Sequence, residues 1–268
     1  MMQGARPVPR LAFGTHVAPG ERVLPDEAAV ALTFNGTTQA VMMATPDHLA
    51  DFAYGFALTE GLARPEEIES LEVVETERGL DVQLWVAPAA EARLTERRRV
   101  MAGPVGCGLC GIDSLEQALR DLPPVPHGRF RLTPAQVMAA AGALERHQPL
   151  HDVTRAAHGA GFWDGARMIA MREDVGRHNA LDKLAGALVR GRTDPGQGAV
   201  VLTSRLSIDL VQKVAALGAP MIIAVSSPSA DAVALAEALN ITLIAQARSD
   251  RFEAFTHTDR ITESQHVG

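Results

Sequence analysis

Cysteine is scarce in this sequence. Only two of the 268 residues are cysteines, Cys107 and Cys110, and they form a single C-x-x-C motif. A chain of this length can bury a sizeable core without disulfide bonds, so a fold built on a disulfide framework is excluded. Any thiol chemistry of the protein is therefore confined to the one segment that carries these two residues.

Long apolar runs are also absent. No uncharged apolar run approaches the ~20 residues that a membrane-spanning helix needs, and residues 1–10 lack the apolar core of a secretory signal. The 25 basic residues are outnumbered by 32 acidic ones, which gives a net charge of -7 and a pI near 5.7. This balance disfavours nucleic acids and anionic membranes as partners, and the basic run at 97–99 is read as a solvated face. We therefore expect a cytoplasmic protein that binds neither nucleic acid nor membrane.

The first third of the chain favours β-structure. Residues 28–34 and 37–43 flank Asn35-Gly36, a pair typical of the two-residue type I′ hairpin turn. A second hairpin is predicted from residues 71–76 and 80–86.

Helix signals follow each of these regions. Thr45-Pro46 predicts a helix with Thr45 as N-cap and Pro46 in the first helical position, and Gly61 ends it. A glycine-rich loop at 103–111 carries both cysteines and leads into another helix, which Asp113 begins.

The second half alternates short apolar segments with amphipathic ones. Strands are predicted at 167–171, 199–203, 220–225 and 241–245, and helices at 175–189, 207–217 and 230–239. This alternation indicates βαβ units, an α/β fold and a largely parallel sheet. The prolines at 123, 124 and 126 indicate a boundary, so we divide the chain into residues 1–125, which are β-rich and include the C-x-x-C loop, and residues 126–268.

Ligands of open α/β sheets bind beyond the carboxyl ends of the strands. Those ends carry Glu173-Asp174, the segment 203–205 with Arg205, the serines at 226–227, and the segment 246–248 with Arg248. Hydroxyls, helix N-termini and two guanidinium groups suit an anionic ligand such as a nucleotide phosphate. Ordinary helix capping explains the serines equally well, so the ligand role stays open on these residues alone.

Four kinds of site use a C-x-x-C motif. Structural zinc needs two further ligands, which the spacing of His147 and His151 would allow, although the glycine-rich setting is unlike a compact zinc ribbon. A thioredoxin-like motif opens the helix after the first strand of a βαβ unit, whereas this motif lies between the two halves. A zinc deaminase needs H-x-E, which the sequence lacks.

A sulfur carrier is the fourth kind of site. The thiolate is the reactive form of cysteine, and the N-terminus of a helix lowers a cysteine pKa. Cys110 stands just before the predicted helix start at Asp113. Cys107 could hold a persulfide that Cys110 assists or resolves by disulfide exchange. The two cysteines alone do not decide between redox chemistry and sulfur transfer.

A polar motif at 173–183, Glu-Asp-Val-Gly-Arg-His-Asn-Ala-Leu-Asp-Lys, ends a predicted strand and begins a helix. His178 and Asp182 lie four residues apart, and a carboxylate can fix the tautomer of a histidine that moves protons. A capped helix with surface pairs is the alternative. His158 stands alone before a strand, and a lone histidine is more often structural.

Several longer motifs occur together and in order. They are Asn35-Gly36, Thr45-Pro46, Gly55-Phe56 with Thr59-Glu60-Gly61, Cys107-Gly-Leu-Cys110-Gly111, residues 173–183, residues 203–207, Val211-Gln-Lys213, Ala224-Val-Ser226, and Phe255-Thr256 with Arg260. With these motifs the chain resembles the formate dehydrogenase accessory sulfurtransferases over nearly its full length.

The resemblance implies a function that spacing does not show. Such proteins accept sulfur from a cysteine desulfurase and pass it to the bis-guanine-dinucleotide form of the molybdenum cofactor, which formate dehydrogenase requires. The molybdenum cofactor is then a bound substrate, and neither a permanent cofactor nor a metal site is expected. The partners implied are a cysteine desulfurase, formate dehydrogenase and a second copy of the chain in a homodimer.

The resemblance also implies a fold and site residues. The fold is α/β, with a cytidine-deaminase-like three-layer sheet and a β-rich N-terminal part. The persulfide position matches Cys107, and Cys110 matches the second family cysteine. The cofactor-binding residues are Gln246, Ala247, Arg248, Ser249, Asp250 and Arg251, to which we add Arg205; Glu173, Asp174, His178 and His158 are expected to form the pocket.

This chain departs from the family pattern at four of its positions. Gln246 stands where an aromatic is common, Asp250 where glycine is common, and Arg155 and Ala156 replace glycines before His158. Two other functions are compatible with the same residues. One is a cofactor-binding chaperone without transfer chemistry, and the other is a thiol-disulfide oxidoreductase.

Overall fold

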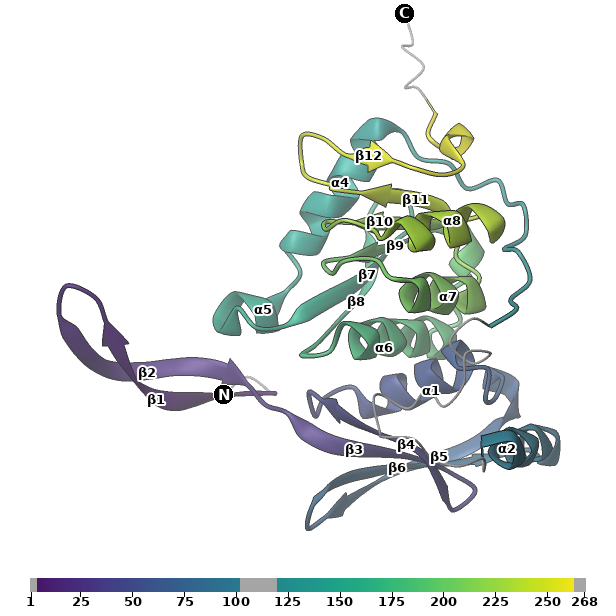
Figure 1. Cartoon of the computed structure of the whole chain (residues 1–268), viewed down its shortest axis with the longest axis horizontal. Helices are drawn as coiled ribbons and strands as arrows, with labels where there is room; N and C mark the ends of the chain where they lie inside the picture. The colour runs from purple at the N-terminus through teal and green to yellow at the C-terminus, as the bar shows by residue number, and fades with distance from the viewer. Residues whose placement is uncertain (1–3, 102–119, 263–268) are drawn as a thin grey trace, which may run out of the picture.

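The computed structural model describes residues 4–101 and 120–262, with side chains described at 4–95 and 120–262. In this part of the chain the strands form three sheets (Figure 1). The first pairs β1 (Ala5–Phe13) with β2 (Val17–Pro25); the second has the order β4-β3-β6-β5, from β3 (Ala28–Phe34), β4 (Thr37–Ala44), β5 (Ile68–Thr76) and β6 (Gly79–Val86). The third has the order β12-β11-β10-β9-β7-β8, from β7 (His158–Trp163), β8 (Met168–Asp174), β9 (Ala199–Leu202), β10 (Met221–Ala224), β11 (Thr242–Ala245) and β12 (Glu253–Ala254).

Helices cover the two larger sheets. The α-helices are α1 (Leu49–Thr59), α2 (Pro88–Met101), α4 (Pro134–Glu145), α5 (Pro149–Thr154), α6 (Arg177–Arg190), α7 (Ile208–Leu217) and α8 (Ala230–Ala238), and the 3₁₀ turns are η1 (Pro65–Glu67), η2 (Pro195–Gln197) and η3 (Thr258–Arg260). The predicted α/β class is therefore confirmed as a mixed α/β structure. None of the helices in the described residues is long and apolar enough to cross a membrane.

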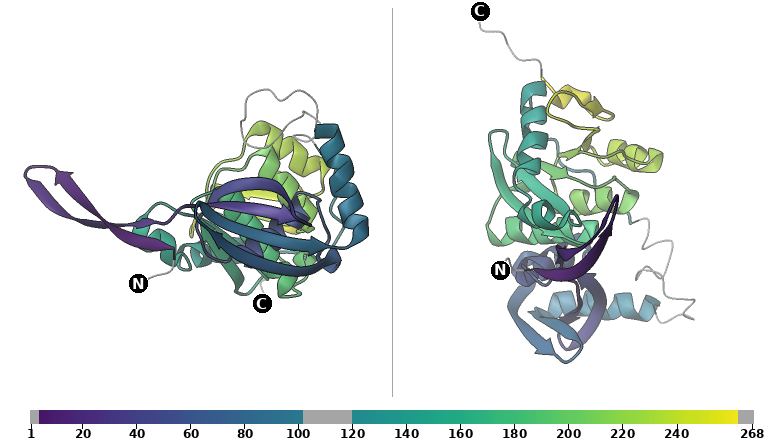
Figure 2. Two further views of the ribbon diagram at one scale, coloured as in Figure 1. Left: turned by 90° about the horizontal axis from the view of Figure 1, so that it is seen from below. Right: turned by 90° about the vertical axis from the view of Figure 1, so that its left-hand side faces the viewer.

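The six-stranded sheet lies between two layers of helices. Val200 and Leu202 of β9 belong to the core beneath α6, α7 and α8, whereas Ala199 and Val201 belong to the core beneath α4. Successive residues of a strand point to opposite faces, so a short strand that is apolar throughout is buried on both sides. Figure 2 shows α4 and α8 on opposite sides of this sheet.

The sheet is less parallel than predicted. β9, β10 and β11 are parallel, but β7 runs antiparallel to both β8 and β9, and β12 runs antiparallel to β11. β7 is absent from the predicted strands because Gly159 and Gly161 weaken its strand pattern. A Cβ atom at Gly159 or Gly161 would come within 2.5 Å of the Met171 or Met168 side chain, so these glycines allow close packing.

The four-stranded sheet confirms both predicted hairpins. Asn35 and Gly36 connect β3 to β4 with φ angles of 44° and 76°, as a type I′ turn requires. The second hairpin pairs β5 with β6 in antiparallel register. Beneath this sheet, Phe52 and Phe56 of α1 pack against buried residues such as Leu32.

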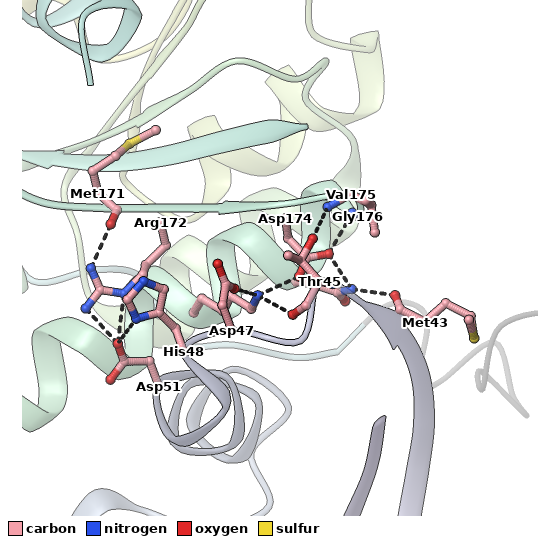
Figure 3. A network of polar contacts seen from close by, with 12 residues as sticks. Met43, Thr45, Asp47, His48, Asp51, Met171, Arg172, Asp174, Val175 and Gly176 are labelled. Atoms are coloured by element: carbon pink, nitrogen blue, oxygen red, sulfur yellow. Dashed lines mark hydrogen bonds and ion pairs between the residues drawn. The ribbon is translucent and has the colours of Figure 1, made fainter. Parts of the chain in front are cut away.

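The predicted start of the first helix is wrong. The helix α1 begins at Leu49, after His48 in the left-handed conformation, and not at Pro46. The Thr45 N–H donates to Asp174 at 3.0 Å, and its Oγ1 accepts from the Val175 N–H at 3.2 Å (Figure 3). A tertiary contact thus uses the groups that a local cap would need. Gly61, with φ of 68°, follows the end of α1 at Thr59 and confirms the predicted stop.

Two glycines bring the halves of the protein together where α1 crosses α6. A Cβ atom at Gly55 would lie 1.7 Å from the Asp182 carbonyl oxygen, and one at Gly186 would lie 1.8 Å from the Asp51 carbonyl oxygen. The two helix backbones therefore touch. The predicted helix start at Asp113 lies outside the described residues, and the predicted boundary at 125 stays a prediction.

The first sheet is a projecting arm. β1 and β2 extend away from both larger sheets, and only the end of the arm beside β3 lies near the rest of the molecule (Figures 1 and 2). There Ala5 and Val23 pack on Leu150 and Ala157. This hairpin is not among the elements predicted from the sequence.

Candidate functional site

The carboxyl ends of the parallel strands form one edge of the six-stranded sheet. Backbone hydrogen bonds connect the loops at this edge: the Leu206 N–H donates to the Ser227 carbonyl at 3.1 Å, and the Gln246 N–H donates to that of Ser226 at 3.3 Å. β7 and β8 contribute His158 and Asp174, which are directly opposite each other in the register. The topology thus brings together most of the segments predicted as a ligand edge.

A cavity of about 620 Å³ lies at this edge, within the size range of ligand pockets. It is lined by Ser227, Pro228, Ser229, Ala230, Val233, Gln246, Arg251, Glu253 and Phe255. Ser229 caps α8 by accepting from the Ala232 N–H at 3.2 Å. The N-terminus of α8 therefore borders the cavity, and helix N-termini favour anions.

The predicted cofactor-binding segment contributes unequally to this cavity. Gln246 and Arg251 line it, and the Gln246 amide donates to the Ser227 hydroxyl. The Arg248 guanidinium instead donates to the carbonyls of Val225 and Ala247. Among the remaining predicted residues, Ala247 is buried in the core, whereas Arg205, Ser249 and Asp250 are exposed and do not line the cavity.

Ser229, Glu253 and Phe255 line the cavity but are not among the predicted site residues. Ser229 has a recognisable signal, because a serine before an alanine-rich helix is a common N-cap. Glu253 and Phe255 lie in and beside β12, a strand of two residues that is too short for a periodic pattern.

Glu173 holds the start of α5. Its two carboxylate oxygens accept from the backbone N–H groups of Leu150 and His151, each at 2.8 Å. Burial raises the pKa of the Glu173 carboxyl, although these two hydrogen bonds oppose the shift. This geometry makes Glu173 a cap for a short helix.

Asp174 joins the two halves. It is fully buried and accepts from the Thr45 N–H, from the Gly176 N–H at 2.8 Å and from the Asn179 side chain at 3.0 Å. The buried Lys183 ammonium forms an ion pair with it at 2.8 Å and also bonds the Thr45 carbonyl at 2.9 Å. Asp174 therefore has its hydrogen-bonding capacity satisfied within the protein.

His178 lies beside a different carboxylate from the one predicted. Its Nε2 contacts Oδ2 of Asp209, in the first turn of α7. Asp182 points elsewhere: it accepts from the Thr59 hydroxyl at 2.6 Å and from the Lys213 ammonium at 2.9 Å. Burial would raise the pKa of Asp209, but its interactions with His178 and Ser207 together hold it well below its usual range.

His158 is half-buried at the start of β7. Burial lowers its pKa, and the nearby positive charge of Arg177 lowers it further. The lowered pKa favours the neutral imidazole, which has one ring nitrogen able to accept a proton.

Cys107 and Cys110 lie outside the described residues, so their predicted roles stay predictions. In the part of the chain that the structure describes, no group of three or more His, Cys, Asp or Glu side chains could hold a metal ion.

Comparison with known proteins decides the family. A model described as the FdhD/NarQ family matches residues 25–262. The chain belongs to the FdhD/NarQ family. It is 50% identical over 246 residues to the sulfur carrier protein FdhD of Agrobacterium fabrum (91% of each chain), and 52% identical over 245 residues to that of Brucella abortus (91% of each chain).

A solved structure has the same fold as this FdhD/NarQ chain. It is the crystal structure of a putative formate dehydrogenase accessory protein from Desulfotalea psychrophila, with a TM-score of 0.75 and 25% identity, covering 96% of this chain and 99% of that one. The resemblance stated from the motifs is thereby confirmed.

Proposed function

We propose that this protein is a sulfurtransferase that accepts persulfide sulfur from a cysteine desulfurase on Cys107 and delivers it to the bis-guanine-dinucleotide molybdenum cofactor of formate dehydrogenase. The proposal is supported by the relatives named sulfur carrier proteins, which match across 91% of the chain. The chain works in the cytoplasm as a homodimer with a cytidine-deaminase-like domain.

The first half-reaction is a thiol-disulfide exchange. The Cys107 thiolate attacks the outer sulfur of the donor's persulfide, so that a new S–S bond forms on Cys107 while the donor S–S bond breaks. The donor cysteine leaves as a thiolate, and no external oxidant or reductant is consumed. In the release step the Cys110 thiolate attacks the Cys107 sulfur, so that the Cys107–Cys110 disulfide forms while the persulfide bond breaks and the outer sulfur leaves as sulfide; a dithiol reductant then restores both thiols for the next cycle.

The cavity at the sheet edge suits a guanine nucleotide portion of the cofactor substrate. Arg251 and the N-terminus of α8 favour phosphate, and Arg248 and Arg205 add positive charge nearby. Phe255, with 41% of its surface exposed, offers a stacking face. The Glu253 carboxylate offers acceptors that match the N–H donors of guanine, which gives preference for this base.

The test of sulfur transfer is intact-mass spectrometry after incubation with an active cysteine desulfurase and cysteine. Wild type should gain one reductant-labile sulfur, about 32 mass units, and Cys107→Ala should gain none. A wild type without the gain would favour a cofactor-binding chaperone, and dithiol cycling without retained sulfur would favour an oxidoreductase.

A calorimetric titration with GDP tests the cavity separately. Arg251→Ala should weaken binding about tenfold, because a hydrogen bond between charged groups contributes ~1.5 kcal/mol or more. Arg167→Ala is the matched control, since this arginine is exposed in the β7–β8 turn. Equal affinity of Arg251→Ala and wild type for GDP would show that the nucleotide does not bind in this cavity.

A further inference from the structure

The four-stranded sheet is covered on one face only. Its inner face packs on α1, and there Val30, Leu32, Val82 and Leu84 are fully buried. The left view of Figure 2, seen from below, shows the four strands in front and α2 beside them at one edge. Within residues 4–101 and 120–262, no helix lies across the opposite face, which we call the outer sheet face.

Apolar side chains lie on the outer sheet face. Ala31 and Trp85 each adjoin buried residues of the inner face, so their side chains point outward. Val41 pairs with Ala31 in the register, and Met43 follows it on the same side of β4. The exposed fractions are 62% for Val41, 53% for Met43 and 40% for Trp85. The apolar residues of this face are Ala29, Ala31, Val41, Met43, Val74 and Trp85.

The charge of this sheet has one sign. The strands β3, β4, β5 and β6 contain no Lys, Arg or His, whereas they carry Glu69, Glu72, Glu75 and Asp81. Glu72 and Asp81 lie on the outer sheet face, because they pair with Gln83 and Val74 there. Residues 28–86 contain ten acidic and two basic residues, so this part of the chain accounts for the negative net charge of the whole. The outer sheet face is therefore complementary to a basic surface.

We propose that the outer sheet face is the docking surface for the protein that donates sulfur, which meets it with an apolar patch surrounded by Lys and Arg side chains. The proposal rests on the proposed function, since it takes the donor to be a separate protein. Apolar side chains exposed together on one face mark an interaction site. The carboxylates among them attract a basic partner and repel an acidic one, which disfavours contact between two copies of this sheet.

The place of this face in the protein favours the donor over the cofactor substrate. β6 ends at Val86, and α2 follows from Pro88 and leads to the segment that carries Cys107. The candidate cofactor cavity lies in the other half, at the edge of the six-stranded sheet (Figure 1). A donor on the outer sheet face therefore leaves that cavity open to its own ligand.

The size of the face suits a transient partner. Four strands about 4.8 Å apart, each with about seven residues of about 3.3 Å, measure about 19 Å by 23 Å, or about 440 Å² in outline. Counted on both partners this is about 900 Å², below the ~1,200 Å² of stable complexes and within the range of transient encounters. A sulfur donor has to leave after each transfer, so a small interface fits its role.

The rate of sulfur loading tests the docking surface. Protein at a series of concentrations is mixed with a cysteine desulfurase and cysteine, and intact mass gives the initial rate of sulfur gain. Val41→Lys and Glu72→Lys should each raise KM about tenfold and change kcat much less, because they repel a basic donor without altering Cys107. Both residues are exposed, so both variants should keep the wild-type circular dichroism and melting temperature.

Val153→Lys is the matched control. Val153 is an apolar residue of α5 in the other half, with 47% of its surface exposed, and its substitution adds the same charge. This variant should keep the wild-type KM. A KM raised as much in Val153→Lys as in Val41→Lys would overturn the proposal, because the effect would then follow from charge alone and not from its place.

The docking surface and sulfur transfer fail in different ways. Sulfur gain in wild type with an unchanged KM in Val41→Lys and Glu72→Lys would overturn the docking surface and leave sulfur transfer standing. A wild type that gains no sulfur would overturn sulfur transfer, and fluorescence anisotropy with labelled desulfurase then decides the docking. Binding that is about tenfold weaker in Val41→Lys than in wild type would support the surface, and equal affinity or no binding would overturn it.

Discussion

A single methyl group at the crossing of α1 and α6 should destabilise the whole protein. In Gly55→Ala the new Cβ would lie 1.7 Å from the Asp182 carbonyl oxygen, and in Gly186→Ala it would lie 1.8 Å from the Asp51 carbonyl oxygen. Each carbonyl would have to retreat by more than about 1 Å to reach the 3.0 Å that Cβ atoms tolerate. Both carbonyls are backbone atoms of helices, so no side chain can move aside to relieve the contact.

The expected cost follows from two opposing effects. Overpacking a core costs about 1–3 kcal/mol and occasionally more, and a contact between two backbones belongs at the upper end. Alanine in a helix gains about 0.5–1 kcal/mol over glycine. Each variant should therefore lose about 2 kcal/mol of unfolding free energy. The double variant should lose less than the sum, because one separation of the helices relieves both contacts.

Urea unfolding, followed by circular dichroism, measures these free energies. Gly142→Ala is the matched control: it lies inside α4, and its Cβ would meet the flexible end of Arg146 at 3.3 Å. This variant should gain stability, by about 0.5–1 kcal/mol. If Gly55→Ala and Gly186→Ala gained stability as Gly142→Ala does, the reasoning about the crossing would be refuted.

Three further predictions concern charged groups. Lys213→Met should cost about 3–5 kcal/mol in urea unfolding, because it leaves the fully buried Asp182 carboxylate without its cation; Asp182→Asn added to it should recover part of that loss. Burial raises the pKa of Glu173 in the folded protein above its value of about 4.3 in the unfolded chain. Its contribution to stability is therefore fully present below the unfolded pKa and is lost as pH rises through the folded pKa. The free energy of unfolding, measured from about pH 4 to about pH 7, should show this fall in wild type and not in Glu173→Gln. Burial raises the pKa of Asp209, but its interactions with His178 and Ser207 together exceed that effect and lower the pKa. Asp209→Asn should therefore cost about 1 kcal/mol at neutral pH after solvent screening, and an equal stability of variant and wild type there would contradict this reasoning.

Local chemistry decides which elements the sequence could predict. Asn35-Gly36 predicts its turn because only residues that tolerate positive φ fit there. Thr45 shows the opposite case, since a partner 129 residues away in the chain takes its N–H and no local pattern reveals that partner. The glycines of β7 are similar: their packing against Met171 and Met168 becomes visible only when β7 and β8 are paired.

The candidate site shows the same division. The strand ends that line its edge could be predicted from the alternating pattern, because parallel strands place their carboxyl ends together. The direction in which each side chain points could not be predicted from that pattern. Arg248 and Arg251 look equivalent in the sequence, yet one guanidinium bonds backbone carbonyls and the other lines the cavity. Only three positions in the chain separate the arginine that bonds backbone carbonyls from the one that lines the cavity.

Most polar residues of the motif at 173–183 are held in structural contacts. Glu173 holds α5, Asp174 and Lys183 hold Thr45 of the other half, and Asp182 holds Lys213. Loss of activity after substituting Asp174, Lys183 or Asp182 would also follow from a loosened junction between the halves. His178 differs, because it lies at the start of α6 and contacts Asp209 at the edge that carries the candidate site. If His178→Gln kept the wild-type unfolding free energy but slowed the loss of sulfur from Cys107, His178 would have a role in the chemistry and not in the fold.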